Sequence, residues 1–117
     1  MSAVQEQTCT WPGKTGAQYK YWVHSLPTTF NPGQDGNYIY SKLTNGYWVP
    51  IYVGEGYLGD RISSNHHQAI CIRNKGATHV HVHTNATLAA RQREESDILA
   101  NFPQAYTPVG CNVKPGG

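Results

Sequence analysis

An arginine that follows a strand-like segment and two glycines is the first residue whose setting suggests chemistry. The apolar segment 51–53 runs into Gly54 and Gly56, and Arg61 stands on the helix-like stretch that follows. Glycines at such a point allow a backbone or a phosphate to approach closely, and a planar guanidinium suits phosphate recognition. The pattern predicts a phosphate-facing turn, unless Arg61 is an ordinary surface residue.

Two tyrosines lie on the strand segments expected beside this turn. Tyr38 belongs to the alternating segment 37–43, and Tyr52 ends the segment that leads into the glycines. A phenol has a pKa near 10, so a tyrosine that takes a proton needs a neighbouring cation, which Arg61 could supply. Taken alone, each tyrosine is more simply a packed strand residue.

A glutamate lies on the inward face of the second helix expected from the sequence. An inward carboxylate is costly unless it is paired, binds a metal or opens into a cleft. Glu95 could therefore form an ion pair with Arg61 or Arg91, or serve as a metal-binding or catalytic carboxylate. Glu94 and Asp97 are expected to face solvent. At 3.6 residues per turn the inward stripe comprises Leu88, Glu95, Ile98, Leu99 and Phe102.

Three histidines alternate with valines on one predicted strand. His79, His81 and His83 would lie on one face, where imidazoles at this spacing could bind zinc or copper. The nearby sequence offers no evident fourth ligand. A half-buried polar strand face and a DNA-contacting face are the alternatives.

The expected elements form a compact α+β domain with a small, mostly antiparallel sheet. Asn45-Gly46 is a strong signal for a hairpin turn, and Pro50 in the return strand indicates a sheet edge or a bulge. Asn85 could cap the last helix, and Leu58, Ile62 and Ile70 are expected on the inward face of the helix before it. The predicted strands are 19–24, 37–43, 47–53 and 78–82, and the predicted helices are 58–73 and 85–102.

The amino-acid composition limits the class of protein but does not identify a binding partner. The chain has 117 residues, 14% of them charged, with a formal net charge of +2. This charge neither demands nor excludes nucleic acid. We expect a flexible arm at 1–17, one domain at 18–112 and a tail at 113–117, with no membrane span and no visible secretory signal.

The cysteines also bear on the expected compartment. Cys9, Cys71 and Cys111 are odd in number, widely spaced and without a Cys-x-x-Cys pair. This pattern argues against a disulfide framework and favours a reducing, intracellular (cytoplasmic) location. The residues carry no indication of the oligomeric state.

Taken in order, the candidate residues resemble the motifs of the GIY-YIG nucleases. The resemblance spans about residues 36–112. It implies a three-stranded antiparallel sheet flanked by helices, here with an extra N-terminal strand or arm, and metal-dependent hydrolysis of DNA phosphodiester bonds. A phage or mobile element is one context in which such an enzyme is expected. The matching positions are Gly36-Asn37-Tyr38, Tyr52-Val53-Gly54, Leu58, Arg61, His66, Glu95, Ile98-Leu99 and Asn112.

The resemblance implies a role for each matching side chain at the phosphate. Tyr38 would take the proton from the attacking water, with Tyr52 as its hydrogen-bonding partner. Arg61 would stabilise the charge on the phosphate. Glu95 would be the single protein ligand of Mg²⁺ or Mn²⁺, which prefer oxygen ligands.

Two further residues complete the set that the resemblance implies. His66, or His67 beside it, would shuttle a proton or donate to the phosphate, and Asn112 would orient a tyrosine or the phosphate. Asn37 departs from the family pattern, where an apolar residue is usual. Two other functions fit the sequence: a non-catalytic nucleic-acid-binding module of the same fold, or a histidine-strand zinc protein.

Overall fold

The protein folds around a five-stranded sheet in which every pairing between strands is antiparallel. The computed structural model describes residues 7–113. The strands are β1 (Thr8–Pro12), β2 (Gln18–Ser25), β3 (Asp35–Thr44), β4 (Tyr47–Tyr57) and β5 (His79–Thr84), in the spatial order β1-β2-β5-β3-β4. The helices are α1 (Leu58–Arg61), α2 (Ala69–Asn74) and α3 (Leu88–Asn101), followed by a 3₁₀ turn at Pro103–Ala105. The prediction of a three-stranded sheet is therefore wrong.

Of the strands beyond the predicted three-stranded sheet, β2 corresponds to the predicted strand 19–24 and β1 comes from the predicted N-terminal arm. Residues 8–12 form β1 and pair with β2, and β2 pairs in turn with β5. Pro12 ends β1, and Gly13 and Gly16, which indicated a loose segment, lie in the turn of this hairpin. Only Trp11 of β1 has a buried apolar side chain, so alternation of side chains could not reveal the strand. Residues 1–6 and 114–117 of the predicted arm and tail lie outside the described residues.

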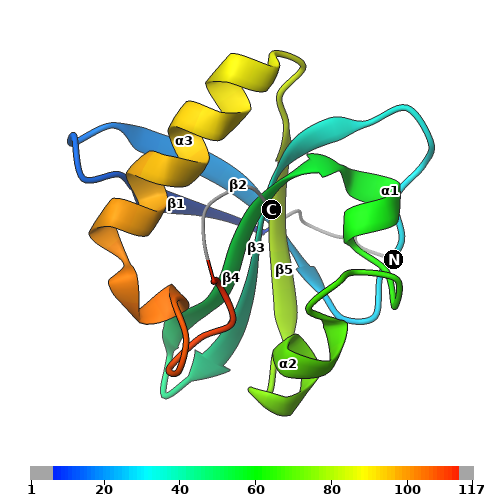
Figure 1. The fold of residues 1–117 in the computed structure, drawn as a ribbon, viewed down its shortest axis with the longest axis vertical. Coiled ribbons are helices and arrows are strands. Elements are labelled where there is room, and N and C mark those ends of the chain that lie inside the picture. The colour runs from blue at the N-terminus through cyan, green and yellow to red at the C-terminus, as the bar shows by residue number, and fades with distance from the viewer. Residues whose placement is uncertain (1–6, 114–117) are drawn as a thin grey trace, which may run out of the picture.

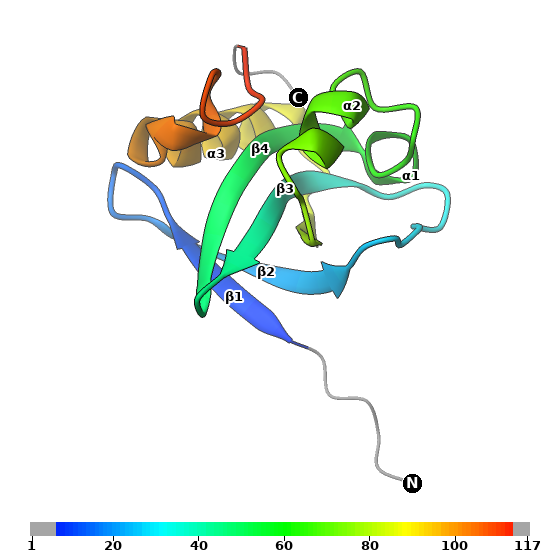
Figure 2. The ribbon, with the colours of Figure 1, turned by 90° about the horizontal axis from the view of Figure 1, so that it is seen from below.

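The helices cover different parts of this sheet. Helix α3 lies on one side and α1 and α2 lie on the other (Figure 1). In the turned view the sheet is strongly curled, and β4 passes between α3 and α2 (Figure 2). One core packs against α3 and includes Trp11, Tyr21, Ile39 and Val53. The other packs against α1 and α2 and includes Tyr38, Tyr40, Tyr52, Leu58 and Ile62.

The hairpin between β3 and β4 confirms the turn prediction. Asn45 and Gly46 have φ values of 52° and 81°, as a two-residue hairpin turn requires. Strand β4 is at the sheet edge, and the register shifts between Tyr40 and Ser41 of β3, so that Tyr40 pairs with Tyr52 but Ser41 with Pro50. Both features expected of Pro50, an edge and a bulge, are present.

The predicted helix at 58–73 is two short helices with a turn between them. Ser63 Oγ donates to the Asp60 carbonyl at 2.6 Å and accepts from the Asn65 N–H at 3.1 Å. Such local side-chain bonds compete with helical ones, so the helix ends and the chain turns before α2. Leu58 and Ile62 are buried as predicted.

Two apolar residues expected on inward helix faces are exposed. The side chain of Ile70 on α2 is 67% exposed and that of Leu88 on α3 is 52% exposed. Asn85 does not cap α3, whose N-cap is Thr87. The inward stripe therefore begins later along the helix than the sequence pattern indicated.

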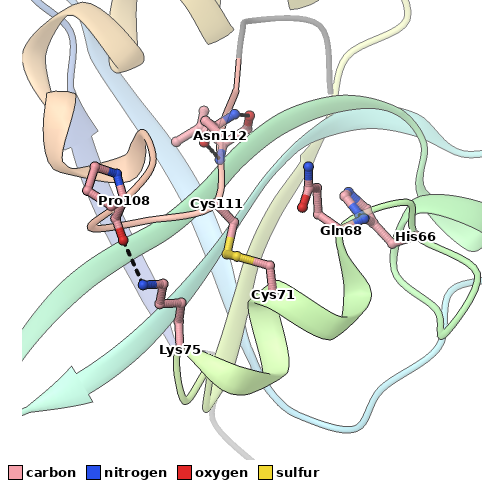
Figure 3. Close-up of a disulfide and its surroundings, with 8 residues drawn as sticks. His66, Gln68, Cys71, Lys75, Pro108, Cys111 and Asn112 are labelled. Atoms are coloured by element: carbon pink, nitrogen blue, oxygen red, sulfur yellow. Dashed lines mark hydrogen bonds between the residues drawn. A yellow bond between two sulfur atoms is a disulfide. The ribbon is translucent and has the colours of Figure 1, made fainter.

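A disulfide bond joins α2 to the C-terminal segment, contrary to the sequence prediction. Cys71 and Cys111 are bonded with an S–S length of 2.05 Å, and beside them Lys75 Nζ donates to the Pro108 carbonyl at 2.6 Å (Figure 3). Cys9 is a free thiol. Disulfides persist mainly in oxidising compartments, so the cysteines no longer support an intracellular location.

Among the helices in the described part of the chain, none combines the length and apolar character needed to cross a membrane.

Candidate active site

The two predicted tyrosines face the same side of the sheet, and a glycine makes room between them. Tyr38 on β3 is directly opposite Gly54 on β4, and Tyr40 is opposite Tyr52. A β-carbon at Gly54 would lie 2.5 Å from Tyr38 Oη. The absence of a side chain there lets the Tyr38 ring lean across the edge strand. Its ring stacks on that of Tyr52 with centroids 6.1 Å apart.

His66 donates a hydrogen bond to the Tyr38 hydroxyl. His66 Nε2 lies 2.7 Å from Tyr38 Oη, and His66 Nδ1 accepts from the Gln68 N–H at 2.9 Å. Burial, followed by the charges of His67 and Arg61, lowers the pKa of His66 to about 4. The ring is therefore neutral at pH 7, and its one proton is on Nε2 because Nδ1 is an acceptor.

The hydrogen bonds continue from Tyr38 to the surface. A side-chain hydrogen bond with Tyr38 lowers the pKa of Tyr52, so the two phenols are linked. Tyr52 Oη lies 3.2 Å from Nε2 of His67, an exposed residue, and can donate to it. The histidine pair left open by the sequence thus divides, with His66 on Tyr38 and His67 on Tyr52.

Arg61 reaches the same face beside these phenols. Its side chain lies over Gly56, where a β-carbon would be 2.8 Å from Arg61 Nε. Its backbone carbonyl accepts from the Tyr40 hydroxyl at 3.1 Å, which holds the end of α1 against the sheet. Both ion pairs found in the described part of the chain involve other residues. Neither of these pairs includes the half-buried guanidinium of Arg61.

The pKa shifts of the two phenols place Glu95 near them. Burial, followed by the proximity of Tyr52, raises the pKa of Tyr38 well above its usual value; Arg61 lowers it and Glu95 raises it. Burial, followed by the charge of Glu95, raises the pKa of Tyr52 to about 12. The side chain of Glu95 is 1% exposed. Its carboxylate faces inward as predicted and acts on both tyrosines.

Asn112 supports the edge strand rather than contacting the phenols. Its Oδ1 accepts from the Val53 N–H at 2.8 Å, and its Nδ2 donates to the Val53 carbonyl at 2.9 Å. The residue after the disulfide therefore pairs with β4 (Figure 3). Because Val53 lies between Tyr52 and Gly54, Asn112 fixes the backbone that carries one phenol and makes room for the other.

A polar contact between the sheet and α3 explains why Asn37 replaces an apolar residue. Asn37 Nδ2 donates to the Arg91 carbonyl at 2.9 Å, and its Oδ1 accepts from Asn85 Nδ2 at 3.2 Å. Arg91 Nε pairs with Glu55 Oε1 at 2.9 Å. Arg91, which the sequence suggested as an ion-pair partner of Glu95, thus forms a salt bridge with Glu55, a residue between the two glycines.

The prediction that Glu94 and Asp97 face solvent is wrong, since both are buried. Glu94 Oε2 accepts from the Tyr21 hydroxyl at 2.5 Å and lies 2.6 Å from His83 Nε2. Asp97 accepts from the Tyr19 hydroxyl at 2.7 Å. The β1–β2 hairpin curls against α3 and covers a second face of the helix, which a one-sided helical wheel does not anticipate.

The three strand histidines have different partners. His81 Nδ1 accepts from Trp11 Nε1 at 3.0 Å and its Nε2 lies 2.7 Å from Ser41 Oγ. His83 Nε2 holds a carboxylate of α3, as described above, and in residues 7–113 no three His, Cys, Asp or Glu side chains are grouped to hold a metal ion. Because the ring nitrogens of His81 and His83 already have these partners, His79, His81 and His83 are not arranged as a set of metal ligands.

We expect the pKa values of three histidines to be shifted in opposite directions from the usual value of an imidazole. Burial lowers the pKa of His66 to about 4 and that of His81 to about 3. Burial also lowers the pKa of His83, but the hydrogen bond and charge of Glu94 outweigh it and raise this pKa. NMR titration of ring ¹⁵N shifts should find His66 and His81 neutral at pH 6, each with its proton on Nε2, and His83 protonated.

The same shifts fix the sign of the pH dependence of stability. The stability associated with neutral His66 and His81 is present above pH 6.5 and is lost as the pH falls toward 4 and 3. The contribution of His83 is present below pH 6.5 and is lost as the pH rises through its raised pKa. A His83 resonance that titrates below pH 6 would contradict the ion pair with Glu94.

Glu95 is the side chain that suits a divalent ion in this site. Mg²⁺ and Mn²⁺ take carboxylate oxygens and commonly keep several waters, so one or two protein carboxylates suffice. The charge of Glu95 acts on both site phenols, which is where a phosphate-directed ion is needed. A site with this one carboxylate is compatible with the predicted ion, and Glu95 as its protein ligand stays a prediction.

The structure thus gathers Tyr38, Tyr52, Arg61 and His66 on one face, brings the charge of Glu95 to them, and places Asn112 behind β4. Sequence reasoning missed the partnership of His67 with Tyr52, although adjacent histidines were a signal for it. No protein-family model matches the chain, and comparisons with curated proteins and with solved structures found no match.

Proposed function

We propose that this protein is a metal-dependent endonuclease that hydrolyses DNA phosphodiester bonds. The observation that supports it most is the meeting of Tyr38, Tyr52 and His66 in one hydrogen-bonded group beside Arg61, whose guanidinium has no ion pair among the described residues. These are the residue types that phosphate hydrolysis needs, and their order along the chain resembles that of the GIY-YIG nucleases.

Arg61 would bind the scissile phosphate. Its guanidinium can form two parallel hydrogen bonds to phosphate oxygens, and its half-buried position strengthens them. As charge grows on those oxygens during attack, a fixed cation stabilises the transition state more than the ground state. Gly56 allows the side chain to lie flat on the strand and keeps it in one place.

Tyr38 would accept the proton of the attacking water. A neutral phenol can do so only by passing on its own proton, and the hydrogen bonds from Tyr38 to Tyr52 and from Tyr52 to His67 supply that path. One proton enters at Tyr38 and one reaches exposed His67, so no charge stays buried. The N–H of His66 and the charge of Arg61 stabilise any negative charge on the Tyr38 oxygen.

Glu95 would hold the metal ion, and Asn112 would maintain the strand. A bound Mg²⁺ or Mn²⁺ neutralises charge on the phosphate and on the leaving oxygen. The bonds of Asn112 to Val53 keep Tyr52 aligned with Tyr38.

Plasmid nicking in Mg²⁺ tests the proposal. We expect Arg61→Ala and Glu95→Gln each to lower the cleavage rate at least ~10²-fold, the usual cost of losing one group that stabilises a transition state. Arg93→Ala, which removes an exposed arginine of α3, is the matched control and should cleave at the wild-type rate. Equal activity of all four proteins would reject the assignment.

The same experiment separates the enzyme from a non-catalytic nucleic-acid-binding module. Binding of DNA without cleavage in Mg²⁺, Mn²⁺, Ca²⁺ and Zn²⁺ would favour the binding module. The buried, directed hydrogen bonds around Tyr38 favour the enzyme, because a binding surface has no need of an engaged phenol.

A further inference from the structure

A pocket lies on the sheet beside α1, outside the residues assigned above. Its volume is about 660 Å³, within the range of roughly 300–1,000 Å³ typical of small-ligand sites. Trp22, His24 and Phe30 supply three aromatic rings, and Gln34 adds an amide. Trp22 is 36% exposed, and the rings of His24 and Phe30 meet edge to face with centroids 5.1 Å apart. The pocket is thus lined by a partly exposed indole and by two rings in edge-to-face contact.

The strand register connects this pocket to Tyr38. Trp22 pairs with Val82, Val82 pairs with Tyr38, and Tyr38 pairs with Gly54. Residues directly opposite on antiparallel strands point to the same face, so the indole and the phenol share one face of the sheet. Two strand spacings separate them, about 10 Å. Val82 and Leu58 form the floor between them.

The chemistry of the pocket suits a nucleobase. Bases stack on exposed aromatic rings whatever their sequence, and a glutamine amide can hydrogen-bond to a base edge. Lys20 Nζ lies over the Trp22 ring, 5.3 Å from its centre. A base that stacks there would displace this flexible ammonium group toward the phosphate that accompanies the base. Arg61 supplies the cation on the other side, next to Leu58 in α1.

We propose that this pocket binds an unpaired base of the DNA strand, one or two nucleotides from the phosphate at Arg61. The inference rests on the proposed function and makes it specific, because the preferred substrate becomes DNA with single-stranded character rather than a continuous duplex. Trp22 is the stacking platform, and Lys20 holds the adjoining phosphate.

Binding in EDTA tests the pocket without any cleavage. Fluorescence anisotropy would compare a 12-nucleotide oligo(dT) with a 12-base-pair duplex. We expect Trp22→Ala to weaken binding of oligo(dT) by about 5- to 150-fold, the range for one lost base–aromatic stack, and to leave duplex binding within about 2-fold. Trp22→Phe should restore most of the affinity, since it keeps an aromatic face.

Tyr47→Ala is the matched control. Tyr47 is an aromatic residue that is 75% exposed and does not line the pocket, so its loss should leave both affinities unchanged. In the wild-type protein, the indole N–H resonance of Trp22 should shift on addition of oligo(dT). That measurement decides the question even if Trp22→Ala fails to fold.

The outcomes of this test and of the nicking assay are distinct. Unchanged oligo(dT) affinity in Trp22→Ala, or an equal loss for oligo(dT) and duplex, would overturn the pocket even if plasmid is cleaved. A selective loss for oligo(dT) with no cleavage in any metal would uphold the pocket and reject the endonuclease. If the indole N–H resonance of Trp22 does not shift at saturating oligo(dT), the proposed base-binding pocket would also be overturned.

Discussion

Tyr38→Phe is expected to lower the DNA cleavage rate by about 10³-fold, within the range of roughly 10²–10⁴ for a lost general base. The phenylalanine ring fits the same space over Gly54, so packing is kept. What is lost is the oxygen that receives a hydrogen bond from His66 and would receive the proton of water. A single-turnover assay at saturating enzyme would measure the chemical step directly.

The structural cost of this substitution should be moderate. The phenylalanine loses the hydrogen bonds of the Tyr38 hydroxyl with His66 and with Tyr52, so the free energy of unfolding should fall by roughly 2–3 kcal/mol, and duplex binding in EDTA should be unaltered. Tyr19→Phe is the matched control, because it removes one phenol hydrogen bond to a carboxylate on the α3 side of the sheet. If Tyr38→Phe cleaves within a few-fold of wild type, Tyr38 is not the proton acceptor.

Loss of the Cys71–Cys111 bond should have the largest effect on stability. The bond closes a loop with a sequence separation of 40, for which chain-entropy arguments give about 4 kcal/mol of stabilisation through the unfolded state. We expect Cys71→Ser to lower the free energy of unfolding by that amount in urea titrations. Cys71 is half-buried, so the serine hydroxyl itself adds little cost.

Cys9→Ser is the control for this prediction, since Cys9 is a free thiol on β1. It should unfold at the wild-type urea concentration, whereas wild type in dithiothreitol should approach Cys71→Ser. The bond also joins the segment after His66 to the residue before Asn112, so the reduced protein should lose cleavage activity at temperatures where it is still folded. Equal stability of reduced and oxidised wild type would contradict the assigned pairing.

Several features of the site followed from local sequence. The pairing of β3, which carries Tyr38, with β4, which carries Tyr52, was predictable because Asn45-Gly46 favours a two-residue turn. That turn sets which residues of the two strands are opposite each other. Glycines after Tyr52 indicated close approach, and the structure places side chains of Tyr38 and Arg61 over them. The inward direction of Glu95 followed from helical periodicity.

Other features depended on contacts that no local pattern encodes. Glu94 was expected in solvent and is bound by Tyr21 and His83, because the β1–β2 hairpin folds back on α3. The histidine strand suggested a metal site, yet Trp11 and Ser41 engage both nitrogens of His81. In each case the partner comes from a strand whose neighbours are set by sheet order.

The sequence by itself determined the chemical groups of the site and their local order: two phenols, an arginine after glycines, an inward carboxylate and a pair of histidines. Residue identity, turn preference and helical periodicity are local properties, so they can be inferred from the amino-acid sequence without the fold. The tertiary structure alone decided the five-stranded sheet, the Cys71–Cys111 bond, the partners of His66 and His67, and the Trp22 pocket. Their physical basis is backbone pairing and packing between residues far apart in the chain, as where β2 pairs with β5.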